Sequence, residues 1–277
     1  MAQMASRRSL RPYKLAGPIH PALTPKLLDE NHLVMAHELY NQLSKYIDAS
    51  YRATKNYQQE VDFIVRRTAT TTGKKIVIDV ACGSGGHAEL LSKAGFDVYA
   101  VDLNPAMLRL LKRNVPKAKA YKQDMRKLQV PVQADVLICM YNSINYNYSY
   151  AELSRTLKHF YDHLKLGGVV IFDTAFMIDT LKPGPFSVET ITASEFEVAR
   201  VNKSSKKRSF GIVDIVFVIF ENGRRKIIET QNKIFLPDRE RILALMKQVG
   251  FTPKLYFDFS DTKRSGTVCV FVGRKSG

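Results

Sequence analysis

The stretch that most limits what this chain can fold into runs from Ile76 to His87, with the sequence IVIDVACGSGGH. A short apolar run ends in Asp79, small residues follow, glycines stand at 83, 85 and 86, and from His87 onward the pattern is helical. This order predicts a buried strand, a tight glycine turn and the N-terminus of a helix. Such a turn lets a ligand approach the main chain closely and offers it free N–H groups, which suit a phosphate or a carboxylate.

The spacing within the turn narrows the choice of ligand. It lacks the third glycine of the dinucleotide fingerprint G-x-G-x-x-G, and it does not contain the P-loop pattern G-x-x-x-x-G-K-[ST]. Asp79, at the end of the strand, would repel a pyrophosphate but would accept hydrogen bonds from an ammonium or a hydroxyl group. The turn therefore predicts a ligand with an amino or hydroxyl group beside the glycines.

The segment DVACGSG resembles motif I of the class I S-adenosylmethionine-dependent methyltransferases, which is commonly D-x-A-C-G-T-G. The resemblance implies S-adenosylmethionine as the cofactor, a ligand with an amino-acid end and no phosphate. His87 also occurs in some of these relatives, directly after the glycines. The cofactor contacts that the resemblance implies along this stretch are Asp79, Ala81, Cys82, Gly83, Ser84, Gly85 and His87.

The pattern around the turn predicts an α/β fold. Apolar strands are expected at 76–79, 97–102, 118–121, 134–140 and 169–172. Helical segments separate them, and Gly167-Gly168 is expected to end the last of these helices. Two further helices are expected before the first strand, over 33–46 and from Tyr57 onward. Alternating strands and helices of this kind form a parallel sheet covered on both faces, with ligands bound beyond the carboxyl ends of the strands.

The last third of the chain has a different pattern. Long β-type runs at 195–201, 212–221 and 226–235 predict an inserted antiparallel sheet. A helix around 242–249 and two strands at 254–259 and 267–272 would then complete the main sheet as an antiparallel edge pair. The whole is interpreted as a Rossmann-like, seven-stranded methyltransferase sheet with helices on both faces. The expected divisions are a basic arm (1–29), a core (30–185 and 237–277) and an inserted β lid (186–236).

Two further acids follow predicted strands. Asp102 lies 23 residues after Asp79, where a carboxylate can accept both ribose hydroxyls, with Leu103 beside it; alternatively, Asp102 caps the helix that starts at Pro105. Asp124 follows the third strand, where an acid can accept the adenine amino group while Met125 packs on the ring. A simple loop acid is the alternative for Asp124.

The segment after the fourth strand, CMYNSINY from Cys139 to Tyr146, resembles small-molecule N-methyltransferases. Amino-sugar N,N-dimethyltransferases typically show C-M-F-S-S-I-G-H there, and glycine/sarcosine methyltransferases show a motif that ends in N-S. Upstream, ELY at 38–40 and KNY at 55–57 resemble the same family's E/D-L-Y and K-D-Y. This resemblance implies that Tyr57 and Met140 also contact the cofactor, and that the methyl acceptor is the amine nitrogen of a small molecule.

One departure from the family bears on catalysis, because the amino-sugar enzymes usually have a histidine where this chain has Tyr146. A histidine can accept a proton near neutral pH, whereas a tyrosine is a poorer base but a good hydrogen-bonding group. Since positioning can supply much of the acceleration of methyl transfer, we expect Tyr40, Asn142 and Tyr146 to orient the acceptor. The alternative for each tyrosine is a packed aromatic residue at the pocket wall.

The charge of the chain keeps a second interpretation open. Its 277 residues include 42 Lys and Arg against 26 Asp and Glu, a formal net charge of +16. Basic clusters stand at 224–226 and at Lys203, Lys206, Lys207 and Arg208. Such clusters are either solvated turns or contacts to a polyanion. The alternatives are therefore an RNA methyltransferase, for example of the cap guanine-N7 type, or a non-catalytic methyltransferase-like RNA-binding scaffold.

The remaining features bear on membrane association, cellular compartment and metal binding. No apolar run approaches the length of a membrane span, so no membrane association is expected. Three scattered cysteines indicate a reducing compartment, for which the cytoplasm is expected, although the basic, acid-free start of the chain weakly resembles a mitochondrial transit peptide. His159 and His163 have a spacing that can bind a metal, but solvated helix residues are favoured and no metal is expected. The sequence leaves the oligomeric state open.

Overall fold

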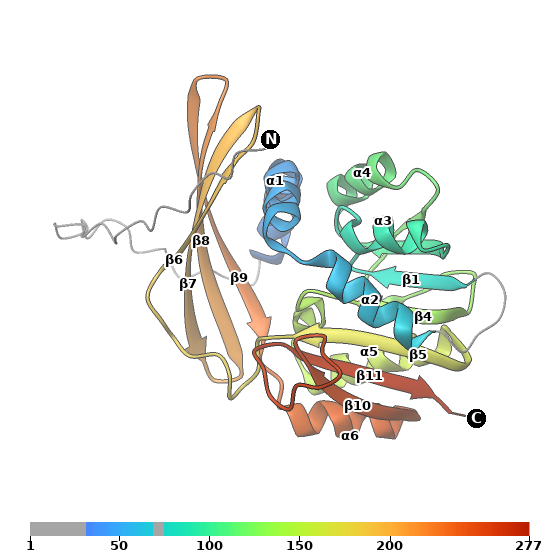
Figure 1. Cartoon of the computed structure of the whole chain (residues 1–277). Helices are drawn as coiled ribbons and strands as arrows, with labels where there is room; N and C mark the ends of the chain where they lie inside the picture. Colours follow the sequence, from blue (N-terminus) through green and yellow to red (C-terminus); the bar gives the residue numbers. More distant parts are fainter. Residues whose placement is uncertain (1–31, 69–74, 277) are drawn as a thin grey trace, which may run out of the picture.

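The computed structural model describes residues 32–68 and 75–276, with side chains from residue 41 onward. The predicted arm at 1–29 lies outside the described residues. Figure 1 shows a sheet covered by helices on both faces, a second and separate sheet, and helix α1 (His32–Thr54) between the two. Within the described ranges, no helix combines the length and the apolar character that crossing a membrane requires.

The main sheet has seven strands in the order β10-β11-β5-β4-β1-β2-β3. The first five strands in the chain run parallel to one another, and β11 is antiparallel to both of its neighbours. The predicted parallel sheet with an antiparallel edge pair is therefore confirmed. The strands are β1 (Ile76–Val80), β2 (Asp97–Asp102), β3 (Lys119–Lys122), β4 (Ala134–Cys139), β5 (Leu164–Thr174), β10 (Phe251–Phe257) and β11 (Cys269–Lys275).

Two layers of helices cover this sheet because successive strand residues point to opposite faces. On one face, Ile78 packs with apolar residues of α5 (Tyr150–Asp162) and α6 (Arg239–Val249). On the other face, Val77 packs with apolar residues of three more helices. These are α2 (Tyr57–Arg67), α3 (Gly86–Lys93) and α4 (Pro105–Asn114). With both faces buried, the carboxyl edge of the strands is the open place where a ligand can bind.

The prediction that Gly167-Gly168 ends a helix is wrong. Helix α5 ends at Asp162, and the two glycines lie inside β5. There the pairing of β5 with β4 shifts in register, between the Ala134–Leu164 and Val136–Val169 partners. A Cβ on Gly168 would lie 2.9 Å from the carbonyl oxygen of Lys165, so the folded-over backbone leaves no room for a side chain. The glycines therefore form an irregular bulge at the start of the strand.

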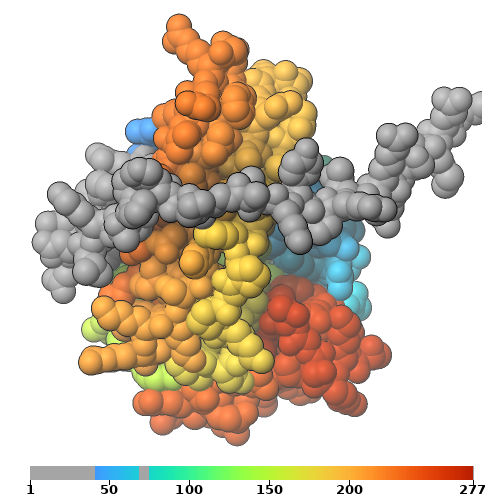
Figure 2. Space-filling view, turned by 90° about the vertical axis from the view of Figure 1, so that its left-hand side faces the viewer, coloured from blue at the N-terminus to red at the C-terminus, as the bar shows by residue number. Residues whose placement is uncertain are grey.

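The second sheet lies between β5 and α6 in the chain and has four antiparallel strands in sequence order. Its strands are β6 (Ser187–Thr192), β7 (Phe196–Lys207), β8 (Phe210–Glu221) and β9 (Arg224–Phe235). Sequence analysis predicted three of them and missed β6, a short strand whose only aliphatic residues are Val188 and Ile191. Figure 2 faces the side of the molecule to which this sheet contributes its yellow and orange strands.

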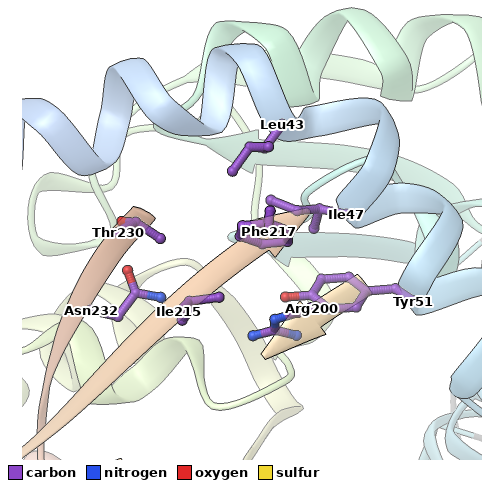
Figure 3. A pocket seen from close by; sticks show the side chains of 8 residues that line it. All are labelled: Leu43, Ile47, Tyr51, Arg200, Ile215, Phe217, Thr230 and Asn232. Atoms are coloured by element: carbon purple, nitrogen blue, oxygen red, sulfur yellow. The ribbon is translucent and has the colours of Figure 1, made fainter. Parts of the chain in front are cut away.

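Helix α1 joins the two sheets. Its residues Leu43, Tyr46 and Ile47 are buried in one cluster with the inner face of the four-stranded sheet and with Met107 and Leu110 of α4. Figure 3 shows part of this contact, where Leu43 and Ile47 lie opposite Ile215 and Phe217 around a small pocket. Polar contacts add to the packing, because the Tyr46 hydroxyl donates to Glu221 over 2.8 Å. The inserted sheet is thus fixed to the core through α1.

Candidate active site

A cavity of about 720 Å³ lies at the carboxyl ends of β1, β2 and β4, where the fold predicts a ligand. Most of the predicted site residues line it, although they come from separate parts of the chain. These are Tyr57, Asp79, Ala81, Cys82, Gly83, Ser84, His87, Asp102, Leu103, Asp124, Met125, Met140 and Tyr146. The structure thus brings these residues together around one space, and their individual roles remain predictions.

The glycine turn forms one wall of this cavity. Gly83 has φ of +55°, and a Cβ built on it would meet nothing within 4 Å, so its open side faces free space. At Gly86, by contrast, a Cβ would lie 2.4 Å from the ring of Tyr57, which packs directly on the turn. Gly85 caps α3 with φ of +91° and is not among the lining residues. The Ser84 hydroxyl donates to Asp48, which ties the turn to α1.

Asp79 is the most deeply buried acid of the cavity, with 1% of its surface exposed. Its Oδ2 atom has no hydrogen-bond partner among the described residues. Burial, together with the charge of Asp102, raises the pKa of Asp79 to about 8, while Lys55 acts in the opposite direction. A buried carboxylate oxygen without a donor is costly, so this site is suited to a ligand that brings an N–H group or a positive charge.

Asp102 also lines the cavity, and it closes the turn. Its carboxylate accepts from the backbone N–H groups of Gly83 and Asn104, each over 2.8 Å. The N-cap of α4 is Asn104, whose side chain accepts from Ala106 N and Met107 N. The alternative assignment of Asp102 as the cap of this helix is therefore wrong.

Asp124 is held by a neighbouring cation. Its carboxylate accepts from the guanidinium of Arg126, with a shortest distance of 2.6 Å, and from the backbone N–H of the same residue. Burial acts to raise the pKa of Asp124, but the hydrogen bonds from Arg126 prevail and hold it below its ordinary value. Asp124 thus combines a structural contact with a place in the cavity wall, beside Met125.

The segment after β4 has a strained backbone. Tyr141 and Asn142 have φ of +59° and +60°, a region that non-glycine residues rarely adopt. The backbone N–H of Tyr141 donates to the carboxylate of Asp173 in β5. The Asn142 side chain accepts from Ala175 N over 2.6 Å and is not among the residues that line the cavity. Asn142 therefore orders the loop, whereas Tyr146 lines the cavity with 37% of its surface exposed.

Asn145 fixes the same segment to the inserted sheet. Its buried side-chain amide donates to the carbonyl oxygens of Phe176 and Phe235, over 2.8 and 2.7 Å. Phe235 is the last residue of β9, and Phe176 follows β5. The loop that carries Tyr146 is thus hydrogen-bonded to both neighbouring segments.

Sequence reasoning missed several lining residues. Lys55 and Tyr141 stand inside the motifs quoted above but were given no role, whereas Tyr51 and Tyr148 carry no motif signal. The strand β9 contributes residues 231–233, which the rule of strand carboxyl ends cannot find because they lie within an antiparallel strand. Lys55 is buried, with Nζ 3.8 Å from the centroid of the Tyr141 ring.

Two further predicted positions cannot be assigned to the cavity wall. Tyr40 belongs to α1, but its side chain lies outside the described part of the structure. His163 has backbone partners at both ring nitrogens, with Nδ1 2.8 Å from His159 O and Nε2 accepting from Val130 N over 3.3 Å. This histidine therefore holds backbone groups together.

The chain is similar in sequence to known methyltransferases. A family model described as a methyltransferase domain matches residues 77–168. Two N,N-dimethyltransferases are similar in sequence, one for dTDP-3-amino-3,4,6-trideoxy-alpha-D-glucopyranose from Streptomyces venezuelae (26% identity) and one for dTDP-3-amino-3,6-dideoxy-alpha-D-glucopyranose from Streptomyces fradiae (27% identity). The matches cover 61% and 60% of this chain, and 72% and 65% of those proteins. A glycine/sarcosine N-methyltransferase from Aphanothece halophytica is 33% identical over 41% of this chain and 45% of its own length.

Solved structures agree in fold. An amino pentose methyltransferase from Micromonospora echinaspora, solved with S-adenosylmethionine bound, superposes with a TM-score of 0.72 at 21% identity and covers 83% of this chain and 97% of its own. A sugar N-methyltransferase from Streptoalloteichus gives 0.74 at 22% identity, over 94% and 100% of the two chains. Residues 77–168 thus form a methyltransferase domain, and this domain together with the relatives indicates an S-adenosylmethionine-dependent enzyme. The solved structures show that the chain has the fold of the class I methyltransferases.

Proposed function

We propose that the protein transfers a methyl group from S-adenosylmethionine to an amine nitrogen of a small molecule. The observation that carries this proposal is the composition of the cavity, which joins two regions of the chain. One is the glycine turn with Asp79, and the other is the segment after β4 with Tyr141 and Tyr146. The second region is the stretch that resembles the small-molecule N-methyltransferases.

The residues around the turn fit this cofactor. S-adenosylmethionine supplies a methyl group on a positively charged sulfur and also carries an ammonium group. Asp79 has a carboxylate oxygen ready for that ammonium, and the open side of Gly83 allows close approach. Asp102 would accept from the ribose hydroxyls, while Met125 and Asp124 would contact the adenine. The prediction of these contacts rests on the resemblance and on the lining of the cavity.

The other end of the cavity supplies hydrogen-bonding groups for an acceptor. Ser143, Tyr146 and Tyr148 contribute hydroxyls, and residues 231–233 of β9 contribute two amides and an ammonium. Such groups can hold a polar molecule with its nitrogen in line with the bond to be broken, which is the main requirement of methyl transfer. The inserted sheet would then act as a wall of the acceptor site, as its predicted role as a lid requires.

The relatives support an amine acceptor, because their names describe N-methylation of amino sugars and of glycine or sarcosine. The matches cover only part of each protein, so the identity of the acceptor is not carried over with the family. Among the relatives and structures compared above, none is named for RNA. Charge alone does not identify a nucleic-acid site.

A labelling experiment tests the proposal. The purified protein is incubated with methyl-labelled S-adenosylmethionine and either a pool of amino sugars and amino acids or total RNA. We expect label in the amine pool, with mass spectrometry placing the methyl group on nitrogen. The variant Gly83→Val, designed to exclude the cofactor, serves as the control. Transfer to RNA together with an unlabelled amine pool would overturn the proposal.

A further inference from the structure

Lys55 is a positive charge built into the cavity wall. It lies between α1 and α2, its backbone N–H donates to Tyr51 O over 2.9 Å, and its side chain is only 10% exposed. Its Nζ lies 3.8 Å from the ring centroid of Tyr141 and 5.3 Å from that of Tyr57. Aromatic faces at these distances attract an ammonium group, so Lys55 is held in a cage that both parts of the cavity share.

Acidic groups surround the same ammonium. Glu60 Oε2 lies 3.5 Å from Nζ, and the carboxylates of Asp79 and Asp173 also act on Lys55 electrostatically. Burial lowers the pKa of Lys55, while these carboxylates oppose the change. The titratable groups that face Lys55 from the neighbouring elements are Tyr57, Glu60 and His87 near the two helices, Asp79 at the end of β1, Tyr141 after β4 and Asp173 in β5.

This arrangement has a consequence for an amine that enters the cavity. Lys55 lines the cavity, whereas Glu60 and Asp173 do not, so an acceptor ammonium that came close to Lys55 would meet a like charge. A like charge lowers the pKa of an amine, because it disfavours the protonated form. A protonated amine has no lone pair and cannot accept a methyl group, so the charge of the bound acceptor decides whether it can react.

We propose that Lys55 is a specificity-determining charge that makes the acceptor amine bind in its neutral, nucleophilic form. This inference rests on the proposed function, since it requires an amine acceptor. The proton leaves the acceptor ammonium for solvent on binding. The nitrogen lone pair then forms the new N–C bond while the electron pair of the S–C bond returns to sulfur. The methylated ammonium that results is repelled by Lys55 in turn, which favours release of the product.

Two substitutions separate this role from that of a general base. Lys55→Met removes the charge while keeping a long apolar side chain. Lys55→Arg keeps the charge but cannot give up its proton in this pH range. If Lys55 acts through its charge, the arginine variant behaves like the wild type; if Lys55 takes the proton itself, the arginine variant fails. Lys93→Met is the control, because Lys93 is an exposed lysine of α3 that does not line the cavity.

The first measurement is the number of protons released when an amine binds. Calorimetry of 3-amino-3-deoxyglucose binding to the complex with S-adenosylhomocysteine, at neutral pH in buffers of different ionisation enthalpy, counts these protons without turnover. We expect close to one proton for the wild type, Lys55→Arg and Lys93→Met, and clearly less for Lys55→Met. Equal proton release in the wild type and Lys55→Met would overturn the inference.

The second measurement is the pH profile of kcat/KM with the same amine. In Lys55→Met the acid limb should move up by about one pH unit, within the range that a nearby charge shifts an amine. Affinity for S-adenosylmethionine should change less than threefold. A large loss of cofactor affinity with an unmoved acid limb would instead assign Lys55 to the cofactor and overturn the inference. A wild type that methylates no amine would contradict the proposed function itself, which is a distinct result.

Discussion

The two sheets of this protein contribute to one cavity in different ways. The seven-stranded sheet supplies residues at or just beyond the carboxyl ends of short, buried strands, such as Asp79 near the end of β1 and Met140 directly after β4. The four-stranded sheet supplies side chains from within the 12-residue strand β9, at 231–233. The sheet topology predicts the strand-end residues, whereas the contribution of residues 231–233 depends on which side chains of β9 point toward the cavity.

The comparison indicates how such an enzyme can vary. The strands of the parallel sheet define the fold, and ligands bind beyond their carboxyl ends. We therefore expect substitutions near these ends to change the affinity for the cofactor. Side chains on a strand of the inserted sheet can change without altering that sheet's hydrogen bonds, which suits the recognition of different acceptors. Helix α1 lies between them, with Asp48 bonded to Ser84 of the glycine turn and Tyr46 bonded to Glu221 of β8. The four predictions below test this division of roles.

The largest effect is expected at the glycine turn. Gly83→Val would place a branched side chain in the cavity and force it into a positive φ, so cofactor binding should fall below detection by calorimetry. The matched control is Gly95→Val. Gly95 has φ of +89°, equally open surroundings and no place in the cavity wall. The control should suffer similar strain and still bind the cofactor; equal loss in both variants would show that strain alone, and not the site, explains the result.

A second prediction concerns Asp79, whose pKa in the folded protein, about 8, lies above its ordinary value of 3.8. Its contribution to folding is therefore fully present below the lower value and is lost as the pH rises through the higher one, by about 1.4 kcal/mol for each pH unit. An asparagine does not ionise, so Asp79→Asn does not lose stability in this way as the pH rises. Without cofactor, the variant should be more stable than the wild type near pH 8, as measured by denaturant unfolding at several pH values.

The same substitution should weaken the cofactor. An ammonium bound by a charged carboxylate gains about 1.5–3 kcal/mol, so calorimetry near pH 8 should show a loss of about 10- to 100-fold in affinity for Asp79→Asn. A variant that is more stable to unfolding but binds the cofactor more weakly would indicate that Asp79 serves ligand binding and not folding. A variant that is less stable than the wild type at pH 8 would contradict the assigned burial effect.

Much of the seven-stranded core could be predicted from the sequence, because its signals are local. The glycines at 83, 85 and 86, Pro105 at the start of a helix and the apolar strands each restrict the backbone within a few residues. Position in such a sheet then places Asp79, Asp102 and Asp124 at one edge. The error at Gly167-Gly168 has a related cause, since a glycine pair ends a helix or forms a bulge equally well, and only the pairing of β4 with β5 decides.

The acceptor half was harder to predict because its signals are not local. Asn142 was expected to orient the acceptor, which stays a prediction; its side chain accepts from Ala175 N, a partner 33 residues away that no spacing rule indicates. Lys55 meets Tyr141, which follows β4, only after the N-terminal helices have packed on the core. The residues at 231–233 reach the cavity only because α1 holds the inserted sheet against the core. Tertiary packing, not propensity, determined these positions.

A third prediction addresses the inserted sheet. Asn232 lines both the main cavity and the small pocket beside α1 (Figure 3). Asn232→Ala should raise the KM for the amine acceptor by about 2- to 12-fold, the value of one neutral hydrogen bond, with unchanged cofactor affinity. Asn202→Ala, in β7 and outside the main cavity, is the control and should leave both constants unchanged. A change in cofactor affinity alone would contradict the assignment of the inserted sheet to the acceptor and of the seven-stranded sheet to the cofactor.

The smallest effect is expected from the basic turn between β7 and β8. Lys206 Nζ donates to Ile178 O, and Lys203 lies over the ring of Phe186 at 5.0 Å. Lys207 and Arg208 are exposed at the end of the hairpin. None of the four is among the residues that line the cavity. Replacing all four with glutamine should therefore change amine methylation by less than about twofold, because exposed charges are screened over ~8 Å at physiological salt.

The same four-residue variant separates the two interpretations of the net charge. If RNA were the acceptor, each lost phosphate contact would reduce the salt slope of RNA binding by about one unit, and the four changes together would weaken methylation of RNA strongly at low salt. The comparison variant neutralises Arg224, Arg225 and Lys226, three charges at the start of β9 beside the hairpin turn between β8 and β9. Unchanged amine turnover in both variants would place the acceptor in the cavity and leave the basic turns as solvated surface. A steep, salt-dependent loss confined to the first variant would instead make this sheet a nucleic-acid contact.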